Sequence, residues 1–334
     1  MTAARSFPTV ASLGRHLSWF RHMRQQQPDR PYRVATEHTV VADDHVLLHA
    51  EVSGFRGAPV TVVLCHGYGL SSSSWCFQRV ALASRARVVA WDLRGHGGSA
   101  YGDPGSGNID QMGRDLFEVI EQVVPEGPVA LVGHSMGGMA IMALAEHHPE
   151  LFGDRVIAVA LLATSAGPVN PSLGLPVGGA ALHLAAHWVS ERLSPGLLPL
   201  LNLVRSLPGY RQAARSLARR FAFASDVSRD VVDLLIDLLD ATSPHVGRDA
   251  FGQFRLHDKR AALEVLQQVT TLVMVGEKDV ITPPRDSEEI ASTVPGADLV
   301  VVPDCGHALI LERPSEVTEW LLAIVDPVQA EQAG

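Results

Sequence analysis

The chain has 334 residues, 46% of them hydrophobic and 19% charged, which excludes a disordered protein and allows one α/β domain with an insertion, or two domains. The net charge of −9 leaves no excess of cations for phosphates, so nucleic acid is not an expected partner. The three cysteines (Cys65, Cys76 and Cys305) lack metal-ligand spacing and do not suggest a disulfide framework, which favours a reducing compartment. We find no apolar run of membrane-spanning length and no signal-peptide pattern, so a cytoplasmic location is expected.

Residues 1–34 form a basic N-terminal extension with six arginines and a single carboxylate, Asp29. Apolar residues within it approximate helical spacing, at Leu13, Leu17, Phe20 and Met23. We interpret this segment as a helix that packs on the body of the protein with its arginines in water. The alternative is a basic amphipathic helix, residues 10–24, that makes a weak contact with a membrane surface.

Strand patterns recur along the chain, at residues 32–41, 45–53, 60–65, 88–92, 129–132, 156–162, 271–275 and 299–302. Helical patterns lie between most of them, at residues 75–84, 108–124, 139–147 and 287–293. Strands that alternate with helices in this way predict a parallel sheet with right-handed crossovers.

The alternation stops between residues 167 and 258, where no strand pattern is convincing. Joints rich in proline and glycine separate helical stretches at residues 180–193, 197–206, 211–223 and 229–239. We interpret residues 167–258 as a helical cap over the carboxyl edge of the sheet, where open α/β folds bind their ligands. Residues 35–166 and 259–328 then form the α/β core.

The sequence around Ser135 has the pattern of a nucleophile elbow, Gly133-x-Ser135-x-Gly137, between an apolar strand and a strong helix former. The glycines admit a strained backbone and let the strand and the helix approach closely. The turn would lift the Ser135 hydroxyl above the sheet edge, at the positive end of the helix. Taken alone, the motif also fits an ordinary Gly-Ser turn between two core elements.

A serine hydroxyl becomes a nucleophile only when a base takes its proton and a third group orients that base. In this architecture the acid and then the histidine follow the serine, each just after a strand. Asp279 follows the strand at 271–275, and His307 follows the strand at 299–302. The rival acids are Glu277, which comes too early in its turn, and Asp304, which would have to fold back on its own loop.

The oxyanion of an acyl-transfer reaction requires two backbone N–H donors. We expect one from Met136, which follows Ser135, and one from Tyr68, in the loop after the strand at 60–65. His66 and Gly67 precede Tyr68. We interpret His66 as a structural residue whose ring binds the loop backbone, so that Gly67 and Tyr68 keep their course, and not as a second base.

The whole set of motifs resembles the α/β-hydrolase fold superfamily, in particular serine esterases and monoacylglycerol lipases. The resemblance covers roughly residues 35–325 and is carried by His66–Gly69, Asp92–Ser99, Gly133–Gly138, Gly276–Asp279 and Gly306-His307. It implies an eight-stranded, mostly parallel sheet flanked by helices, with a cap after the sixth strand. It also implies that His96 is structural.

The expected activity is hydrolysis of a small-molecule carboxylic ester, with a medium or long apolar acyl chain, through an acyl-enzyme on Ser135, with no cofactor and no metal. Apolar residues of the predicted cap could line an acyl pocket or belong to its core: Leu182, Leu184, Trp188, Val189, Leu197, Leu198, Leu200, Leu201 and Leu203. His183, His187 and Glu191 are spaced one helical turn apart, which suits a metal, but a solvated polar face is the favoured interpretation.

Alternatives on the same triad are a thioesterase, a perhydrolase and a C–C bond hydrolase. The last is less favoured, because that group usually has Asn at the position of His134. A non-catalytic binding protein is a further alternative, although the complete set of catalytic residues weighs against it.

Overall fold

The computed structural model describes residues 35–54, 57–169, 207–242 and 244–332. The N-terminal extension with its proposed membrane contact and the predicted helices at 180–193 and 197–206, including His183 and Glu191, lie outside these residues. The strands are β1 (Thr36–Val41), β2 (Leu47–Ser53), β3 (Thr61–Cys65), β4 (Arg87–Trp91), β5 (Val129–His134), β6 (Val156–Leu162), β7 (Thr270–Gly276) and β8 (Asp298–Val302).

The strands form an eight-stranded sheet in the order β1-β2-β4-β3-β5-β6-β7-β8. β1 pairs antiparallel with β2, and β2 pairs antiparallel with β4, whereas all pairs from β4 to β8 are parallel. The predicted eight-stranded, mostly parallel sheet is thereby confirmed. Because the strands from β4 to β8 run the same way, the loops after β3, β5, β7 and β8 meet at one edge.

Helices and 3₁₀ turns connect the strands: η1 (Ser72–Trp75), α3 (Cys76–Leu82), α4 (Ile109–Val123), α5 (Met136–His147), η2 (Pro149–Leu151), α8 (Tyr210–Phe221), α9 (Arg229–Ala241), α10 (Pro244–Leu256), η4 (Arg260–Gln268), α11 (Pro284–Thr293), α12 (Leu309–Glu312) and α13 (Pro314–Gln332). Two differences from the sequence prediction matter. Helix α5 begins at Met136, directly after Ser135, and not at Met139. Helix α10 was not predicted, because Gly247 and Gly252 weaken its helical pattern, although Pro244 suits a first turn.

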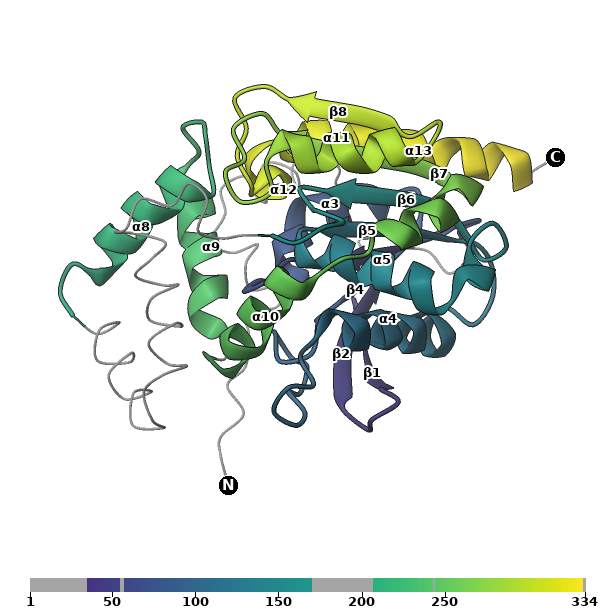
Figure 1. The fold of residues 1–334 in the computed structure, drawn as a ribbon, viewed down its shortest axis with the longest axis horizontal. Coiled ribbons are helices and arrows are strands. Elements are labelled where there is room, and N and C mark those ends of the chain that lie inside the picture. The colour runs from purple at the N-terminus through teal and green to yellow at the C-terminus, as the bar shows by residue number, and fades with distance from the viewer. Residues whose placement is uncertain (1–34, 55–56, 170–206, 243, 333–334) are drawn as a thin grey trace.

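The helices cover the sheet on both faces (Figure 1). Side chains that alternate along each central strand enter two separate apolar clusters. Leu131 of β5 packs in the cluster that includes α4 and α5, whereas its neighbours Ala130 and Val132 pack in the cluster that includes α3 and α13. Both faces of the central strands are therefore dry, as expected for a parallel sheet.

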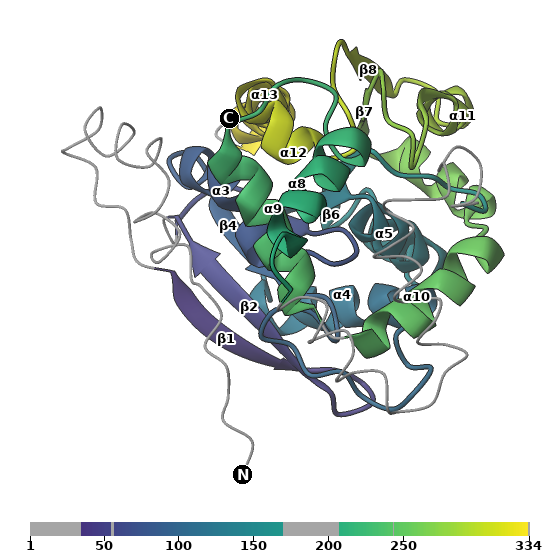
Figure 2. The same cartoon turned by 90° about the vertical axis from the view of Figure 1, so that its left-hand side faces the viewer.

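Helices α8, α9 and α10, here called the cap helices, come between β6 and β7 and lie beside the carboxyl edge of the sheet (Figures 1 and 2). Their contacts with the edge loops are close. A Cβ atom at Gly69, after β3, would lie 2.6 Å from Leu239 of α9, and one at Gly306, after β8, would lie 2.7 Å from the carbonyl oxygen of Ala222. Within the described residues, no helix is long and apolar enough to cross a membrane.

Candidate active site

Ser135 lies at the junction of β5 and α5 in a strained conformation, with φ 53° and ψ −118°. Two hydrogen bonds hold its backbone: its N–H donates to the Leu162 carbonyl at 2.9 Å, and Thr164 Oγ1 donates to the Ser135 carbonyl at 2.8 Å. The flanking glycines are required because backbone atoms of neighbouring segments lie close to their Cα atoms. A Cβ at Gly133 would lie 2.5 Å from the Gly138 nitrogen, and one at Gly137 would lie 2.2 Å from the Cys65 carbonyl oxygen.

The structure brings Ser135, His307 and Asp279 together, although the serine and the histidine are 172 positions apart in the sequence. His307 Nε2 lies 3.0 Å from Ser135 Oγ, and His307 Nδ1 lies 2.8 Å from Asp279 Oδ2. An ionised carboxylate can only accept, so the proton of the neutral imidazole lies on Nδ1. Nε2 is then the bare nitrogen that can take the proton of the serine hydroxyl.

Asp279 is 3% exposed and is held in place by the turn that follows it. Its Oδ1 accepts the N–H groups of Ile281 at 2.8 Å and Thr282 at 3.0 Å, and its Oδ2 accepts the Thr282 hydroxyl at 2.9 Å. The rival acids face elsewhere. Asp304 pairs with Lys278, and Glu277 accepts the Asp304 N–H at 3.2 Å. Of the three acids, Asp279 is the one whose carboxylate binds the His307 ring.

Two buried histidines fix the loop that carries Tyr68. The Leu93 N–H donates to His66 Nε2 at 2.9 Å, so His66 Nδ1 carries the proton and donates to the Gly67 carbonyl at 2.8 Å. In the same way His96 Nε2 accepts the Gly69 N–H at 3.1 Å. Burial lowers the pKa of His66, and it lowers the pKa of His96 to about 3. Both rings stay neutral and crosslink the loops after β3 and β4.

The remaining predicted residues lie around Ser135. A Cβ at Gly67 would lie 3.1 Å from the Ser135 Cβ, so this loop runs directly against the serine. The half-buried ring of Tyr68 stands edge-on to His96 and to Phe254 of α10. Met136 is the first residue of α5, and N–H groups in a first helical turn have no intrahelical acceptor.

His134, immediately before Ser135, was not assigned a role from the sequence. Its Nε2 donates to the His307 carbonyl at 2.9 Å, since a carbonyl can only accept. Its Nδ1 is buried and has no hydrogen-bond partner within the described part of the chain. Burial is the main cause that lowers the pKa of His134 to about 3, with the nearby His307 adding to it. The neutral ring therefore links the elbow to the loop of His307.

Sequence reasoning also missed Thr282, whose Oγ1 lies 2.9 Å from Asp279 Oδ2 and 3.2 Å from His307 Nδ1. A local signal existed for Thr282. An aspartate side chain often accepts the backbone N–H groups two and three positions later, in an Asx turn, and Thr282 is three positions after Asp279. His134 gave no such signal, because its partner lies 173 residues away.

The described residues hold one group of side chains with the spacing of metal ligands, Asp110, Glu146 and His147. Lys259 already places its ammonium between two of them. Its Nζ donates to Asp110 Oδ1 at 2.5 Å and to Glu146 Oε2. The cation at this position is therefore supplied by the chain itself.

The fold and the site together define a class: an α/β enzyme fold that exposes a serine on a strained elbow at the carboxyl edge of a parallel sheet. Residues 62–320 match the model of the alpha/beta hydrolase family, and the chain belongs to this family.

Relatives are similar over most of the chain. It is 30% identical to a pimeloyl-[acyl-carrier protein] methyl ester esterase of Nitrosomonas europaea, over 80% of this chain and 96% of that protein. It is 29% identical to the dihydrolipoyllysine-residue acetyltransferase component of an acetoin cleaving system of Pseudomonas putida, over 82% of this chain, but spans only 65% of that protein. A thermophilic esterase from Thermogutta terrifontis has a similar structure, with a TM-score of 0.67 and 25% identity over 88% of this chain and all of the esterase. The chain is a hydrolase of this family with esterases among its relatives.

Proposed function

We propose that the protein cleaves carboxylic esters through an acyl-enzyme formed on Ser135. The observation that carries the proposal is the hydrogen-bonded series Ser135 Oγ–His307 Nε2, 3.0 Å, and His307 Nδ1–Asp279 Oδ2, 2.8 Å. This series has the order and the tautomer that proton transfer from the serine requires. The similarity to two esterases supports an ester as the substrate.

In the proposed mechanism His307 Nε2 takes the Ser135 proton while the serine oxygen attacks the ester carbonyl. His307 then protonates the leaving alcohol, and the same steps with water release the acid. Asp279 holds the ring in the required tautomer and stabilises its charged form. Among the described residues, the buried histidines near the serine do not compete for the proton, because burial lowers the pKa of His66, His96 and His134.

The oxyanion that forms in each tetrahedral intermediate would accept the N–H groups of Met136 and Tyr68. Met136 offers the first amide of α5, whose dipole favours negative charge at that end. Tyr68 belongs to the loop that His66 and His96 fix against Ser135. Such preorganised donors do not have to reorient during the reaction, which makes them effective.

We further propose that the acyl chain is apolar. Apolar side chains of the cap helices contact the loop next to Ser135: Leu239 reaches Gly69, and the ring of Phe254 meets that of Tyr68. Val280 and Ile281, directly after Asp279, are 45% and 39% exposed. Apolar surface around a reactive polar centre is typical of sites for small molecules.

The test is a series of p-nitrophenyl esters from acetate to palmitate, with wild-type protein and Ser135→Ala. Loss of the serine should lower kcat by on the order of 10⁶-fold. We expect wild-type kcat/KM to peak at a medium or long acyl chain. Folded protein that shows no Ser135-dependent hydrolysis of any ester would contradict the proposal. A matched series of thioesters, and peroxide with a short carboxylate, would then distinguish the other reactions open to this triad.

A further inference from the structure

Glu312, the last residue of α12, is a buried carboxylate that accepts hydrogen bonds from two separate segments. Its Oε1 accepts the Ala224 N–H at 2.9 Å, the Ser225 N–H at 2.6 Å and the Ser225 hydroxyl at 2.6 Å. Its Oε2 accepts the Gly306 N–H at 2.7 Å. Ala224 and Ser225 belong to the cap connector (residues 222–227, between α8 and α9), and Gly306 belongs to the histidine loop (residues 303–308).

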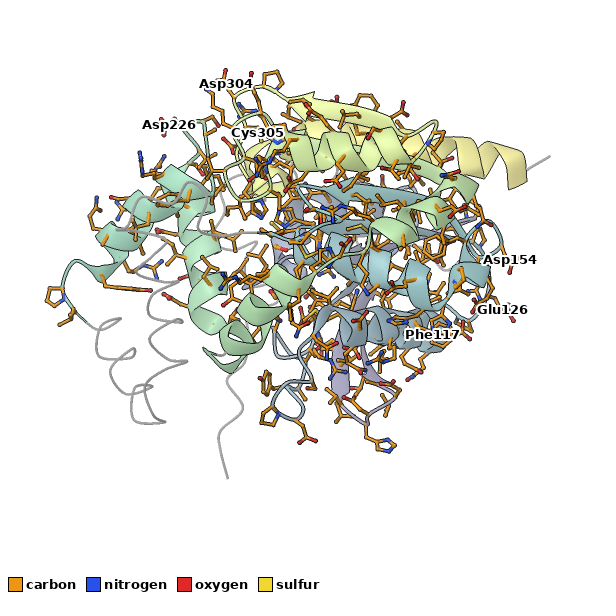
Figure 3. The ribbon with its side chains drawn as sticks, viewed as in Figure 1. Phe117, Glu126, Asp154, Asp226, Asp304 and Cys305 are labelled. Atoms are coloured by element: carbon orange, nitrogen blue, oxygen red, sulfur yellow. The ribbon has the colours of Figure 1, made fainter. Side chains whose placement is uncertain are left out.

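Other contacts join the same two segments. The Ala308 N–H donates to the Ala222 carbonyl at 2.8 Å. Arg313 spans the gap, donating from Nη1 to Ser225 Oγ and from Nη2 to the Asp304 carbonyl, each at 2.9 Å. Figure 3 labels Asp226 of the cap connector in the same part of the molecule as Asp304 and Cys305 of the histidine loop. The connector and the loop therefore form one hydrogen-bonded unit with Glu312 at its centre.

This unit holds the backbone on both sides of His307. The Gly306 N–H binds Glu312, and the Ala308 N–H binds the cap connector directly. Between them, the His307 carbonyl accepts His134 of the elbow. Two of these three hydrogen bonds join the histidine loop to α12 and to the cap connector. The third joins it to the end of strand β5. A displacement of the cap connector is thus transmitted to the backbone that sets the distance between His307 Nε2 and Ser135 Oγ.

We propose that Glu312 is a positioning residue that couples the cap helices to His307. The inference rests on the proposed function, because it assumes that His307 is the base for Ser135. A carboxylate suits this task, because each of its oxygens can accept several hydrogen bonds. Here one oxygen faces the cap connector and the other faces the histidine loop. Contacts between a bound substrate and the cap then act on kcat through the histidine loop.

The first variant is Ser225→Ala, which removes one hydrogen bond to Glu312 and one to Arg313 without touching the triad. We expect kcat for the preferred ester to fall about tenfold with KM unchanged, because small displacements of a catalytic group slow the reaction strongly. Ser225→Thr keeps the hydroxyl and should restore the rate. Ser216→Ala is the matched control, because it removes an exposed hydroxyl of α8 that binds only within its own helix, and it should keep the wild-type rate.

The second variant is Glu312→Gln, whose amide has a single acceptor oxygen and must turn an NH₂ group toward N–H donors on one side. We expect kcat to fall by about 10²-fold. Hydrogen exchange of residues 303–308, followed by mass spectrometry, tests the coupling without any ester. Exchange should be faster than wild type in Ser225→Ala and in Glu312→Gln, and unchanged in Ser216→Ala.

Unchanged exchange over residues 303–308 in Ser225→Ala overturns the coupling, as does a fall in kcat that Ser225→Thr and Ser216→Ala share. If wild-type protein hydrolyses no ester through Ser135, the proposed function fails and the exchange measurement alone decides whether the cap and the histidine loop are coupled. The two failures are thus distinguishable.

Discussion

The loops at the sheet edge and the cap helices are held in different ways. At the sheet edge, buried side chains bind partners that are distant in the sequence, as when His134 binds His307 and His66 binds Leu93. The hairpin of α8 and α9 also buries apolar side chains such as Val232 and Ile236, but its two helices are joined to each other by ion pairs that range from partly buried, as in Arg215–Asp233, to exposed, as in Arg211–Asp237. Exposed ion pairs contribute little to stability, whereas buried hydrogen-bonded networks are costly to break.

The difference separates two tasks. Proton transfer needs fixed distances, and a dry network on a rigid sheet provides them. We expect contact with a substrate to need a surface that can vary without loss of the fold, and the exposed side of the cap hairpin can vary in this way. Glu312 is where the two regions meet. The following experiments test this contrast in order of decreasing effect.

The largest effect is expected at the acid of the sheet edge. Asp279→Asn would turn an NH₂ group toward His307 Nδ1 and favour the wrong tautomer, so kcat should fall about 10⁴-fold. The measurement is ester hydrolysis by protein shown to be folded. Glu277→Gln is the control, because that exposed carboxylate does not contact the His307 ring and its loss should leave kcat within about twofold. Equal losses in the two variants would mean that the triad is misassigned.

A second effect is expected in acid. His96 and His134 have a pKa of about 3 in the folded protein against an ordinary value of 6.5, so the unfolded chain binds more protons below that value. Their contribution to stability is complete above about pH 6.5 and is lost as the pH falls toward 3. At about 1.4 kcal/mol per proton and pH unit, the free energy of unfolding should drop by ~4 kcal/mol between about pH 7 and about pH 5.

Urea unfolding at several pH values measures this drop. The variant His134→Gln has no ring that titrates. We therefore expect the slope of its unfolding free energy against pH, between about pH 5 and about pH 7, to be smaller than the wild-type slope by the equivalent of about one proton. A slope equal to that of the wild type would show that His134 does not remain neutral in the folded protein.

A third effect contrasts two leucines. Leu131 is fully buried in the cluster beneath the elbow, and Leu131→Ala should lower the free energy of unfolding by about 3 kcal/mol through the cavity that it leaves. Leu256 of α10 is 77% exposed, and Leu256→Ala should change it by less than about 0.5 kcal/mol. Urea unfolding measures both, and similar losses would contradict the assignment of Leu131 to the stabilising core.

The smallest effect is expected for the exposed ion pairs between α8 and α9. Arg211→Ala removes the exposed pair with Asp237 at 2.8 Å and should lower the free energy of unfolding by only about 0.5 kcal/mol. Because salt screens such a pair, the loss should shrink further at high ionic strength. A loss of several kcal/mol, insensitive to salt, would place this pair with the buried network of the sheet edge.

The sequence by itself determined the strands and their mostly parallel arrangement, and it picked out Ser135, Asp279 and His307, the three residues that we propose as a triad. Those features depend on local signals: apolar runs predict buried strands, glycines around Ser135 predict the elbow, and Asp279 and His307 each follow a strand. The order of the motifs along the chain then placed them at one edge, because parallel strands bring their ends together. Helix α10 was missed, since its glycines hide a helix that its tertiary contacts support.

Only the tertiary structure decided which polar groups hold the site in place. His134 and Glu312 are ordinary polar residues in the sequence, and nothing in their spacing indicates their partners, whereas Thr282 left a local signal in its spacing from Asp279. Glu312 binds residues 87 and 88 positions away in the cap connector, and His134 binds a carbonyl 173 positions away. Such bonds depend on burial and distance after the chain has folded. A sequence specifies them through packing and not through a local pattern.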